Sequence, residues 1–176
     1  ITAVDQWGNA VSVTTTINLG YGNGCIVDGA GFFLNNEMDD FSSKPGVPNA
    51  FGLVGNEANA IEPEKRPLSS MTPTIVLKND KPFLIIGSPG GSTIITTTMQ
   101  TILNVIDHNM DIKEAVCSAR FHSQWLPDVI QFEPNSLTKD VRINLESKGH
   151  KLLPRSGFIG EANGILITED GFYGGG

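Results

Sequence analysis

Residues 83–106 contain no charged side chain, and no other part of the sequence constrains the fold as strongly. An uncharged run of this length could span a membrane, but Pro89, three glycines and many threonines leave only its two ends strongly apolar. The run instead predicts a buried strand at 83–86, a turn at 87–92 and a helix at 92–109. The helix repeats apolar residues at helical spacing, which predicts one apolar face: Ile95, Met99, Ile102, Leu103 and Ile106.

The rest of the pattern predicts an α+β chain in which helices pack on sheets. A hairpin is expected from strands at 1–4 and 10–17, with Thr16 and the following Asn18 projecting from one face. Residues 35–68 hold four prolines and show little periodicity, as in a lid or a binding loop. The other expected strands are 32–34, 74–77, 151–153 and 164–167, and the other expected helices are 111–116 and 138–148.

The composition excludes several classes of protein. The 176 residues include 12 basic and 19 acidic side chains, and the net charge of −7 argues against a nucleic-acid-binding surface. A hydrophobic fraction of 39% with only 18% charged residues is that of a folded chain rather than a disordered one. Cys25 and Cys117 have no metal-binding spacing and no indicated pairing. We therefore expect one domain over residues 1–176, without a bound metal.

An acidic cluster, residues 35–40 (NNEMDD), follows the strand expected at 32–34. Its three carboxylates and two amides can hold either a ligand ammonium group or a hard metal ion. The spacing of a calcium loop is missing, which favours the ammonium group, and a solvated turn is the plain alternative. Ser69 and Ser70 end the long loop, where their hydroxyls can donate to a ligand carboxylate or simply form polar surface.

The turn at 87–92 (GSPGGS) places two glycines just before the expected helix. Such a turn can present N–H groups to an anion or an oxyanion, or it can be a plain connection in which Ser92 caps the helix. It matches neither a Walker loop nor a nucleophile elbow. His122 lies in a polar and aromatic cluster, residues 120–125 (RFHSQW), but spacing alone assembles no triad of serine, histidine and acid.

Three longer motifs carry a resemblance to a known family: residues 34–42 (LNNEMDDFS), 65–74 (KRPLSSMTPT) and 87–92. The likeness continues through residues 120–127 to Gly149-His150. Together these motifs closely resemble the small subunit of bacterial γ-glutamyltransferases over nearly the whole chain. The resemblance implies the fold of the N-terminal-nucleophile hydrolases, a four-layer αββα sandwich that a large subunit from the same precursor completes.

The resemblance also implies an enzyme without a cofactor, located in the periplasm or secreted. In that family the precursor cleaves itself, and the new N-terminal threonine attacks the γ-amide of glutathione or of a related γ-glutamyl compound. Water or the amine of an amino acid or peptide then takes the γ-glutamyl group from the threonine ester. The α-amino group of the threonine serves as the base.

Carried over residue by residue, the resemblance assigns a binding site for the two charged groups on the α-carbon of the glutamyl donor. Asn18, Glu37 and Asp40 would hold the α-ammonium group. Ser69 and Ser70 would bind the α-carboxylate, together with an arginine of the large subunit.

The resemblance further places the backbone N–H groups of Gly90 and Gly91 in an oxyanion hole, with Thr16 hydrogen-bonded to the nucleophile. The family's small subunit opens with Thr-Thr-His or similar, immediately before the strand that starts here at Ile1. The nucleophile is therefore expected three residues before Ile1. The chain is expected to be a partial small subunit, short at its C-terminal end as well and inactive on its own.

Three departures from the family pattern leave alternatives open. Residues 118–121 (SARF) replace Ala-Pro-Arg-Phe, Thr93 replaces a common arginine, and Phe51 replaces a lid tyrosine found in some members. The same fold could act on poly-γ-glutamate or on the side-chain amide of a β-lactam, although a long lid suits a small donor better than a polymer. A catalytically silent homologue with a structural role is the remaining alternative.

Overall fold

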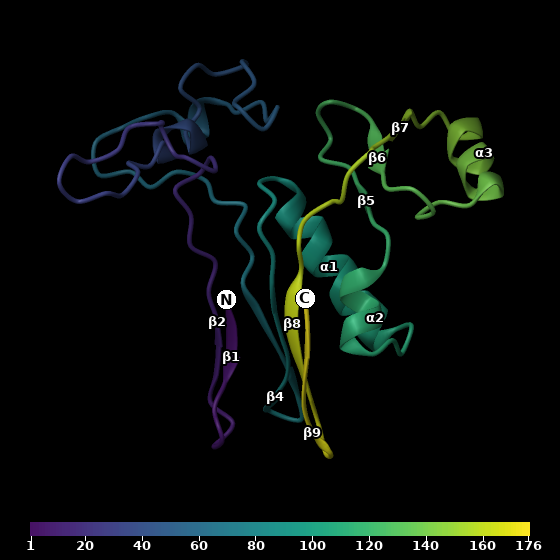
Figure 1. Ribbon diagram of the computed structural model, residues 1–176. Helices are drawn as coiled ribbons and strands as arrows, with labels where there is room; N and C mark the ends of the chain where they lie inside the picture. Colours follow the sequence, from purple (N-terminus) through teal and green to yellow (C-terminus); the bar gives the residue numbers. More distant parts are fainter. The chain divides into compact units, whose positions relative to one another are not determined.

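The computed structural model describes residues 1–176, which form two compact units. Unit 1 comprises residues 1–14 and 71–176, and unit 2 comprises residues 15–70. The ribbon in Figure 1 follows the chain through both units. The uncharged segment 83–106 is shared among a strand, a turn and a helix. None of the helices is both long enough and apolar enough to cross a membrane.

The centre of unit 1 is an antiparallel sheet. In hydrogen-bonding order, its strands are β3 (Thr74–Lys78), β4 (Lys81–Gly87), β8 (Asn163–Thr168) and β9 (Gly171–Gly175). The first three confirm the strands predicted from the sequence. Strand β9 escaped prediction because its glycine-rich sequence, GFYGG, is more typical of a turn than of a strand.

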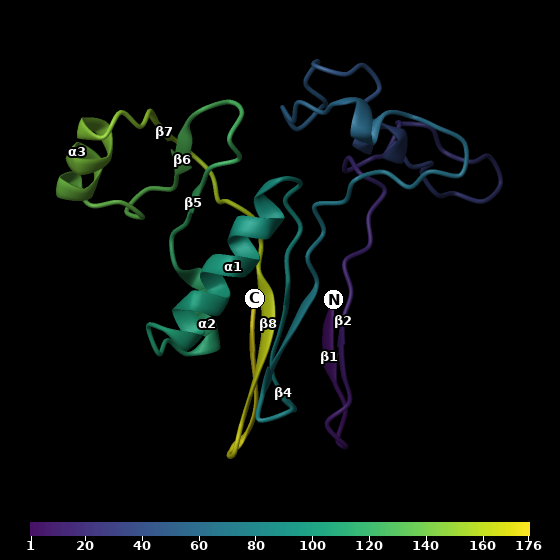
Figure 2. The same cartoon turned by 180° about the vertical axis from the view of Figure 1, so that it is seen from behind.

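Both faces of this sheet are covered (Figures 1 and 2). The hairpin of β1 (Thr2–Val4) and β2 (Ala10–Ser12) packs on one face, and helices α1 (Thr93–Ile106) and α2 (Ile112–Cys117) pack on the other. Burial on both sides explains the continuous apolar run of β4, in which residues 84–86 are completely buried. The layers confirm the predicted α+β class and supply three of the four layers of an αββα sandwich.

The first hairpin is shorter than predicted. Its turn forms as expected, because the Asp5 carboxylate accepts hydrogen bonds from the N–H groups of Trp7 and Asn9, both at 2.9 Å. Strand β2, however, ends at Ser12, whose hydroxyl donates to the carbonyl of Ile86 in β4 at 2.8 Å. Residues 13–17 therefore continue outside any strand, and the predicted strand at 10–17 is only partly present.

Helix α1 confirms the predicted helix but turns its threonines, rather than most of its large apolar residues, toward the interior. Thr97 and Thr101 are completely buried, whereas Ile95 and Met99 are about half exposed, at 51% and 48%. The buried hydroxyls are satisfied: Thr97 donates to the Ile159 carbonyl at 3.2 Å, and Thr101 donates to the Thr97 carbonyl at 2.9 Å. Periodicity located the apolar face of this helix but not the direction in which it points.

A second, three-stranded sheet in unit 1 has the order β5-β6-β7, with β5 (Phe121–His122), β6 (Ile130–Phe132) and β7 (Leu152–Pro154). Helix α3 (Lys139–Ser147) connects β6 to the parallel strand β7, as parallel pairing requires. The helix ends before Gly149, whose φ of 90° suits glycine. The helices predicted at 111–116 and 138–148 are thus confirmed as α2 and α3.

Unit 2 contains little regular structure, as the long aperiodic segment predicted. Its two short 3₁₀ helices are η1 (Glu37–Asp40) and η2 (Glu57–Asn59). The strand predicted at 32–34 is reduced to a single bridge between Ile26 and Phe33. Side-chain hydrogen bonds to the backbone organise much of this unit, and they determine the geometry of the candidate site.

Candidate functional site

The structure brings Asn18 and Thr16 to the acidic turn formed by η1. Asn18 has a φ of 72°, a left-handed conformation that asparagine tolerates, and its side chain donates to the Asn36 carbonyl at 3.1 Å. In return, Asn36 Oδ1 accepts from the N–H of Leu19 at 3.0 Å. Thr16 Oγ1 accepts from the Asn18 N–H at 2.7 Å. These residues therefore cluster through a turn and not, as predicted, by projecting from one strand.

The three carboxylates of η1 have different surroundings. Asp39 supports the loop of residues 44–55, because its Oδ2 accepts from the Ala50 N–H at 3.1 Å. Glu37 Oε1, in contrast, is buried and has no hydrogen-bond partner. Burial raises the pKa of Glu37, and the neighbouring Asp40 raises it further. Burial also raises the pKa of Asp40; a side-chain hydrogen bond with Glu37 opposes this rise, and the charge of Asp39 adds to it. A ligand ammonium group would relieve this crowding of negative charge.

A pocket of about 210 Å³ lies beside Asp40, and Ser70 is part of its wall. Asn59 joins these two parts of unit 2: its Nδ2 donates to the Asp40 carbonyl at 2.8 Å, and its Oδ1 accepts from the Leu68 N–H at 2.9 Å. Glu37, Asn18 and Ser69 do not line this pocket. The structure thus brings two of the five predicted binding residues to one pocket.

Sequence reasoning missed Asn59. It lies in an aperiodic loop, and the only available signal was chemical: an asparagine amide can donate and accept at the same time, so that it can join two backbone segments.

The loop of residues 44–55, part of the segment expected to be a lid or a binding loop, is closed by its own hydrogen bonds. The N–H of Gly46 donates to the Gly55 carbonyl, and the N–H of Asn49 donates to the Leu53 carbonyl, each at 2.9 Å. The side chain of Asn49 also accepts from the N–H of Phe51 at 3.0 Å. Phe51, where some family members carry a tyrosine, therefore lies at the tip of a small closed loop.

The glycine turn, residues 87–92, connects β4 to α1 in unit 1. Both of its predicted oxyanion residues have positive φ angles, 139° at Gly90 and 57° at Gly91. A Cβ atom at Gly90 would lie 2.6 Å from Thr93 Oγ1 and 3.3 Å from the Cα atom of Gly160, so a side chain does not fit there. Thr93 Oγ1 donates to the Gly90 carbonyl at 2.8 Å. The departure at Thr93 therefore has a structural role, because this hydroxyl fastens the turn.

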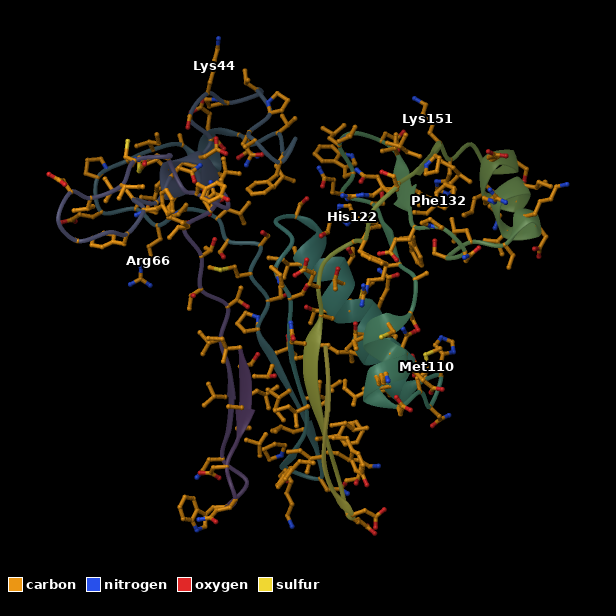
Figure 3. All side chains as sticks on the ribbon, viewed as in Figure 1. Lys44, Arg66, Met110, His122, Phe132 and Lys151 are labelled. Carbon is orange, nitrogen blue, oxygen red and sulfur yellow. The ribbon has the colours of Figure 1, made fainter.

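The alternative hypothesis for this turn was a plain connection in which Ser92 caps the helix. The capping by Ser92 is wrong. Ser92 occupies the N-cap position of α1 but makes no capping hydrogen bond. Its hydroxyl donates instead to Gln124 Oε1 at 2.7 Å. His122, which is labelled in Figure 3, lies beside the same amide: its Nε2 is 2.9 Å from Gln124 Oε1.

The structure contains no group of three or more histidine, cysteine, aspartate or glutamate side chains arranged to hold a metal ion. Cys25 and Cys117 are both exposed and unpaired. The ammonium site and the solvated turn thus both stay open for the carboxylates of η1.

Comparison with known proteins decides the family. A family model described as gamma-glutamyltranspeptidase matches residues 1–176. The chain belongs to this family. A curated relative, the glutathione hydrolase proenzyme of Escherichia coli strain K12, is 50% identical over 168 residues, which are 96% of this chain and 29% of the relative. The chain thus spans under a third of that relative.

Solved structures agree with the family assignment and with the fold. A mutant gamma-glutamyltranspeptidase of Helicobacter pylori superposes with a TM-score of 0.94 at 57% identity, covering 99% of this chain and 95% of that one. A cephalosporin acylase of Bacillus halodurans is more distant, with a TM-score of 0.76, 28% identity, and coverage of 91% of this chain and 28% of that one. The N-terminal-nucleophile hydrolase fold predicted from the motifs is therefore confirmed.

Proposed function

We propose that this chain is most of the small subunit of an enzyme that transfers the γ-glutamyl group of glutathione and related donors to water or to an amine. One observation carries the proposal: the crowded carboxylates of η1 lie in the same unit as a pocket bordered by Asp40 and Ser70. Such a site suits a ligand with an ammonium group and a carboxylate on one carbon. The name of the E. coli relative, glutathione hydrolase proenzyme, supports the same substrate.

The binding residues form two groups, one for each charged group on the α-carbon of the donor. Asn18, Glu37 and Asp40 hold the α-ammonium group, whose positive charge offsets the burial that raises the two carboxyl pKa values. Ser69 and Ser70 donate hydroxyl hydrogens to the α-carboxylate. Both contacts are available to the donor before and after reaction, so they govern binding and orientation of the γ-amide more than the chemical step.

The chemical step follows from the glycine turn and from a threonine that we place three residues before Ile1. The threonine hydroxyl adds to the γ-carbonyl carbon, and its proton passes to the threonine's own α-amino group. Negative charge develops on the carbonyl oxygen, where the N–H groups of Gly90 and Gly91 stabilise it. The C–N bond then breaks, the leaving amine takes the proton, and the γ-glutamyl ester remains for water or an acceptor amine.

The start of the first hairpin supports this placement of the nucleophile. The carbonyl of Ile1 accepts a hydrogen bond from the Val13 N–H at 2.8 Å, so strand pairing extends to the beginning of the chain. The family resemblance places the hydroxyl of Thr16 beside the nucleophile that a segment preceding Ile1 would carry. A hydroxyl there can hydrogen-bond the nucleophile and orient it.

Exposed apolar side chains support a partner chain, which we propose to be the large subunit of the same precursor. Val11 on β2 is 49% exposed, and the apolar face of α1 is largely uncovered at Ile95 and Met99. Apolar surfaces of this kind are covered in stable assemblies. The large subunit would complete the fourth layer and supply the arginine for the α-carboxylate. The periplasmic or secreted location rests on the family resemblance alone.

The proposal is tested with the complete protein by the release of a chromogenic amine from a γ-glutamyl anilide. We expect turnover, inhibition by glutathione, and no turnover of the matching glutaryl anilide, which lacks only the α-amino group. Cleavage of a cephalosporin side-chain amide without release from the γ-glutamyl anilide would instead favour the acylase alternative. No cleavage of either substrate by correctly processed protein would favour the silent homologue.

A further inference from the structure

We propose that His122 is a positioning residue for the glycine turn, acting through Gln124 and Ser92. The inference rests on the proposed function, in which Gly90 and Gly91 form the oxyanion hole. It concerns how the chain keeps those two backbone N–H groups in place, and it begins with the residue that follows them.

Ser92 connects the glycine turn to a distant part of unit 1. It directly follows Gly91 and occupies the N-cap position of α1, where a serine side chain ordinarily accepts from a backbone N–H in the first helical turn. Ser92 forgoes that bond, and its hydroxyl donates to Gln124 Oε1 at 2.7 Å instead. The orientation of Ser92 is therefore determined by Gln124, not by its own helix.

The orientation of the Gln124 amide is fixed in turn by Leu126. Gln124 Nε2 donates to the Leu126 carbonyl at 3.0 Å, which leaves Oε1 to face both Ser92 and His122. An amide oxygen can only accept, so His122 Nε2, at 2.9 Å, carries the hydrogen. The other ring nitrogen, Nδ1, lies 2.8 Å from Thr96 Oγ1, whose hydroxyl donates to the Thr93 carbonyl at 3.1 Å. Both ring nitrogens of His122 thus lie within hydrogen-bond distance of a side chain.

This network holds the start of α1 at two points, Ser92 and Thr96, and joins both to strand β5 through one buried ring. His122 is only 2% exposed, so water does not compete for these hydrogen bonds. Figure 3 shows His122 beside the start of α1. From the first residue of α1, Thr93 Oγ1 donates to the Gly90 carbonyl at 2.8 Å. The two glycines are therefore held both by their own helix and by β5.

The positioning role predicts an effect on rate rather than on donor binding. Oxyanion donors act where charge develops, and a small displacement weakens the transition state more than the bound donor. In the complete protein, we expect His122→Phe and Ser92→Ala each to lower kcat for a γ-glutamyl anilide by about 10-fold to 100-fold. This is no more than the fall in kcat, about 100-fold to 1000-fold, that follows the loss of a whole oxyanion donor. The donor KM should change by less than about 3-fold, because uniform binding is retained.

Conservative variants and a double variant distinguish a positioning role of His122 from a general effect on the stability of the fold. His122→Gln retains an N–H that can reach Gln124, and Ser92→Thr retains the hydroxyl, so both should recover much of the lost kcat. The double variant Ser92→Ala/His122→Phe should be little worse than either single variant, since both act through one chain of hydrogen bonds. His108→Gln, which changes an exposed histidine just after α1, is the matched control and should behave as the wild type.

Hydrogen exchange supplies a readout that does not depend on activity. The amides of residues 90–96 should exchange faster in His122→Phe and in Ser92→Ala than in the wild type or His108→Gln. Unchanged kcat and unchanged exchange would overturn the inference, and so would a fall in kcat that only follows a lowered melting temperature. An inactive wild type would refute the proposed function instead, and the exchange rates would still decide whether His122 positions the turn.

Discussion

The side-chain amide of Asn59 donates to the backbone carbonyl of Asp40 at 2.8 Å. The same amide accepts from the Leu68 N–H at 2.9 Å, so that one residue of η2 joins the acidic turn to the segment that carries Ser70. Both bonds go to backbone groups, and neither engages the Asp40 carboxylate. The separation between the two halves of the proposed donor site is thus set by an uncharged side chain.

Asn59→Ala should therefore weaken donor binding without removing any group that touches the donor. Two backbone groups lose their partner, which costs about 1–3 kcal/mol, and the donor KM should rise correspondingly while kcat falls less. The matched control is Asn56→Ala, since Asn56 accepts from the Ala58 N–H at 3.0 Å within the same 3₁₀ helix. Equal effects of the two variants would show that Asn59 acts only by stabilising η2.

Asp40→Asn should weaken donor binding far more than it disturbs folding. It removes one charge-assisted contact to the α-ammonium group, worth roughly 2–4 kcal/mol in a partly buried site. The measurement is the KM for a γ-glutamyl anilide in the complete protein. Asp28→Asn removes an equal charge from an exposed position of unit 2 and should leave the KM unchanged. An unchanged KM in Asp40→Asn would contradict the assignment.

The pH dependence of stability should distinguish crowded carboxylates from paired ones. Burial raises the pKa of both Glu37 and Asp40 in the folded chain. Groups with raised pKa values contribute stability that is present below their unfolded pKa and is lost as the pH rises through the folded pKa. From about pH 4 to about pH 7, the urea midpoint of the wild type should therefore fall relative to that of Asp40→Asn. A relative rise would indicate that cationic partners already neutralise these carboxylates.

Replacing both Ser69 and Ser70 by alanine should discriminate between donors. Each lost hydroxyl bond to a carboxylate is worth about 1.5–3 kcal/mol. The KM for a γ-glutamyl anilide should therefore rise strongly, whereas an analogue without the α-carboxylate, already a poor substrate, should lose little more. Equal losses for both substrates would point to a folding defect in place of a lost contact.

Gly90→Ala should be more damaging than Gly91→Ala, and both should lower kcat more than they raise KM. At Gly90 the new methyl group would lie 2.6 Å from Thr93 Oγ1, and the φ of 139° is unfavourable for alanine. Gly91 has a φ of 57°, which a residue with a side chain adopts more readily. Steady-state kinetics of the complete protein tests the order. A loss of affinity with unchanged turnover would refute the oxyanion role.

The fold was predictable where local chemistry decides it. Asn79 and Asp80 both have positive φ angles, 54° and 60°, as expected for the tight turn between β3 and β4. Asp111 caps α2 by accepting from the Glu114 N–H at 2.8 Å. The direction of α1 was not predictable, because burial of Thr97 depends on the Ile159 carbonyl far along the chain.

The candidate site, like the fold, could be predicted from the sequence only in part. The acidic cluster at 35–40 and the glycine turn were visible as patterns, but the roles of Glu37, Asp40, Gly90 and Gly91 came only from the family resemblance. Asn59 and Gln124 were not found, since each acts by joining segments that only the folded chain brings together. Whether the assigned residues have their proposed roles stays a prediction that the variants above test.

The central claim is that a γ-glutamyl group passes through an ester on a threonine that precedes Ile1. Mass spectrometry with peptide mapping tests it most directly, on the complete protein quenched in acid during turnover of a γ-glutamyl anilide. The account predicts one γ-glutamyl group per small subunit, on the threonine three residues before Ile1, and none when that threonine is replaced by alanine. A γ-glutamyl group on any other residue, or rapid turnover by the alanine variant, would contradict it.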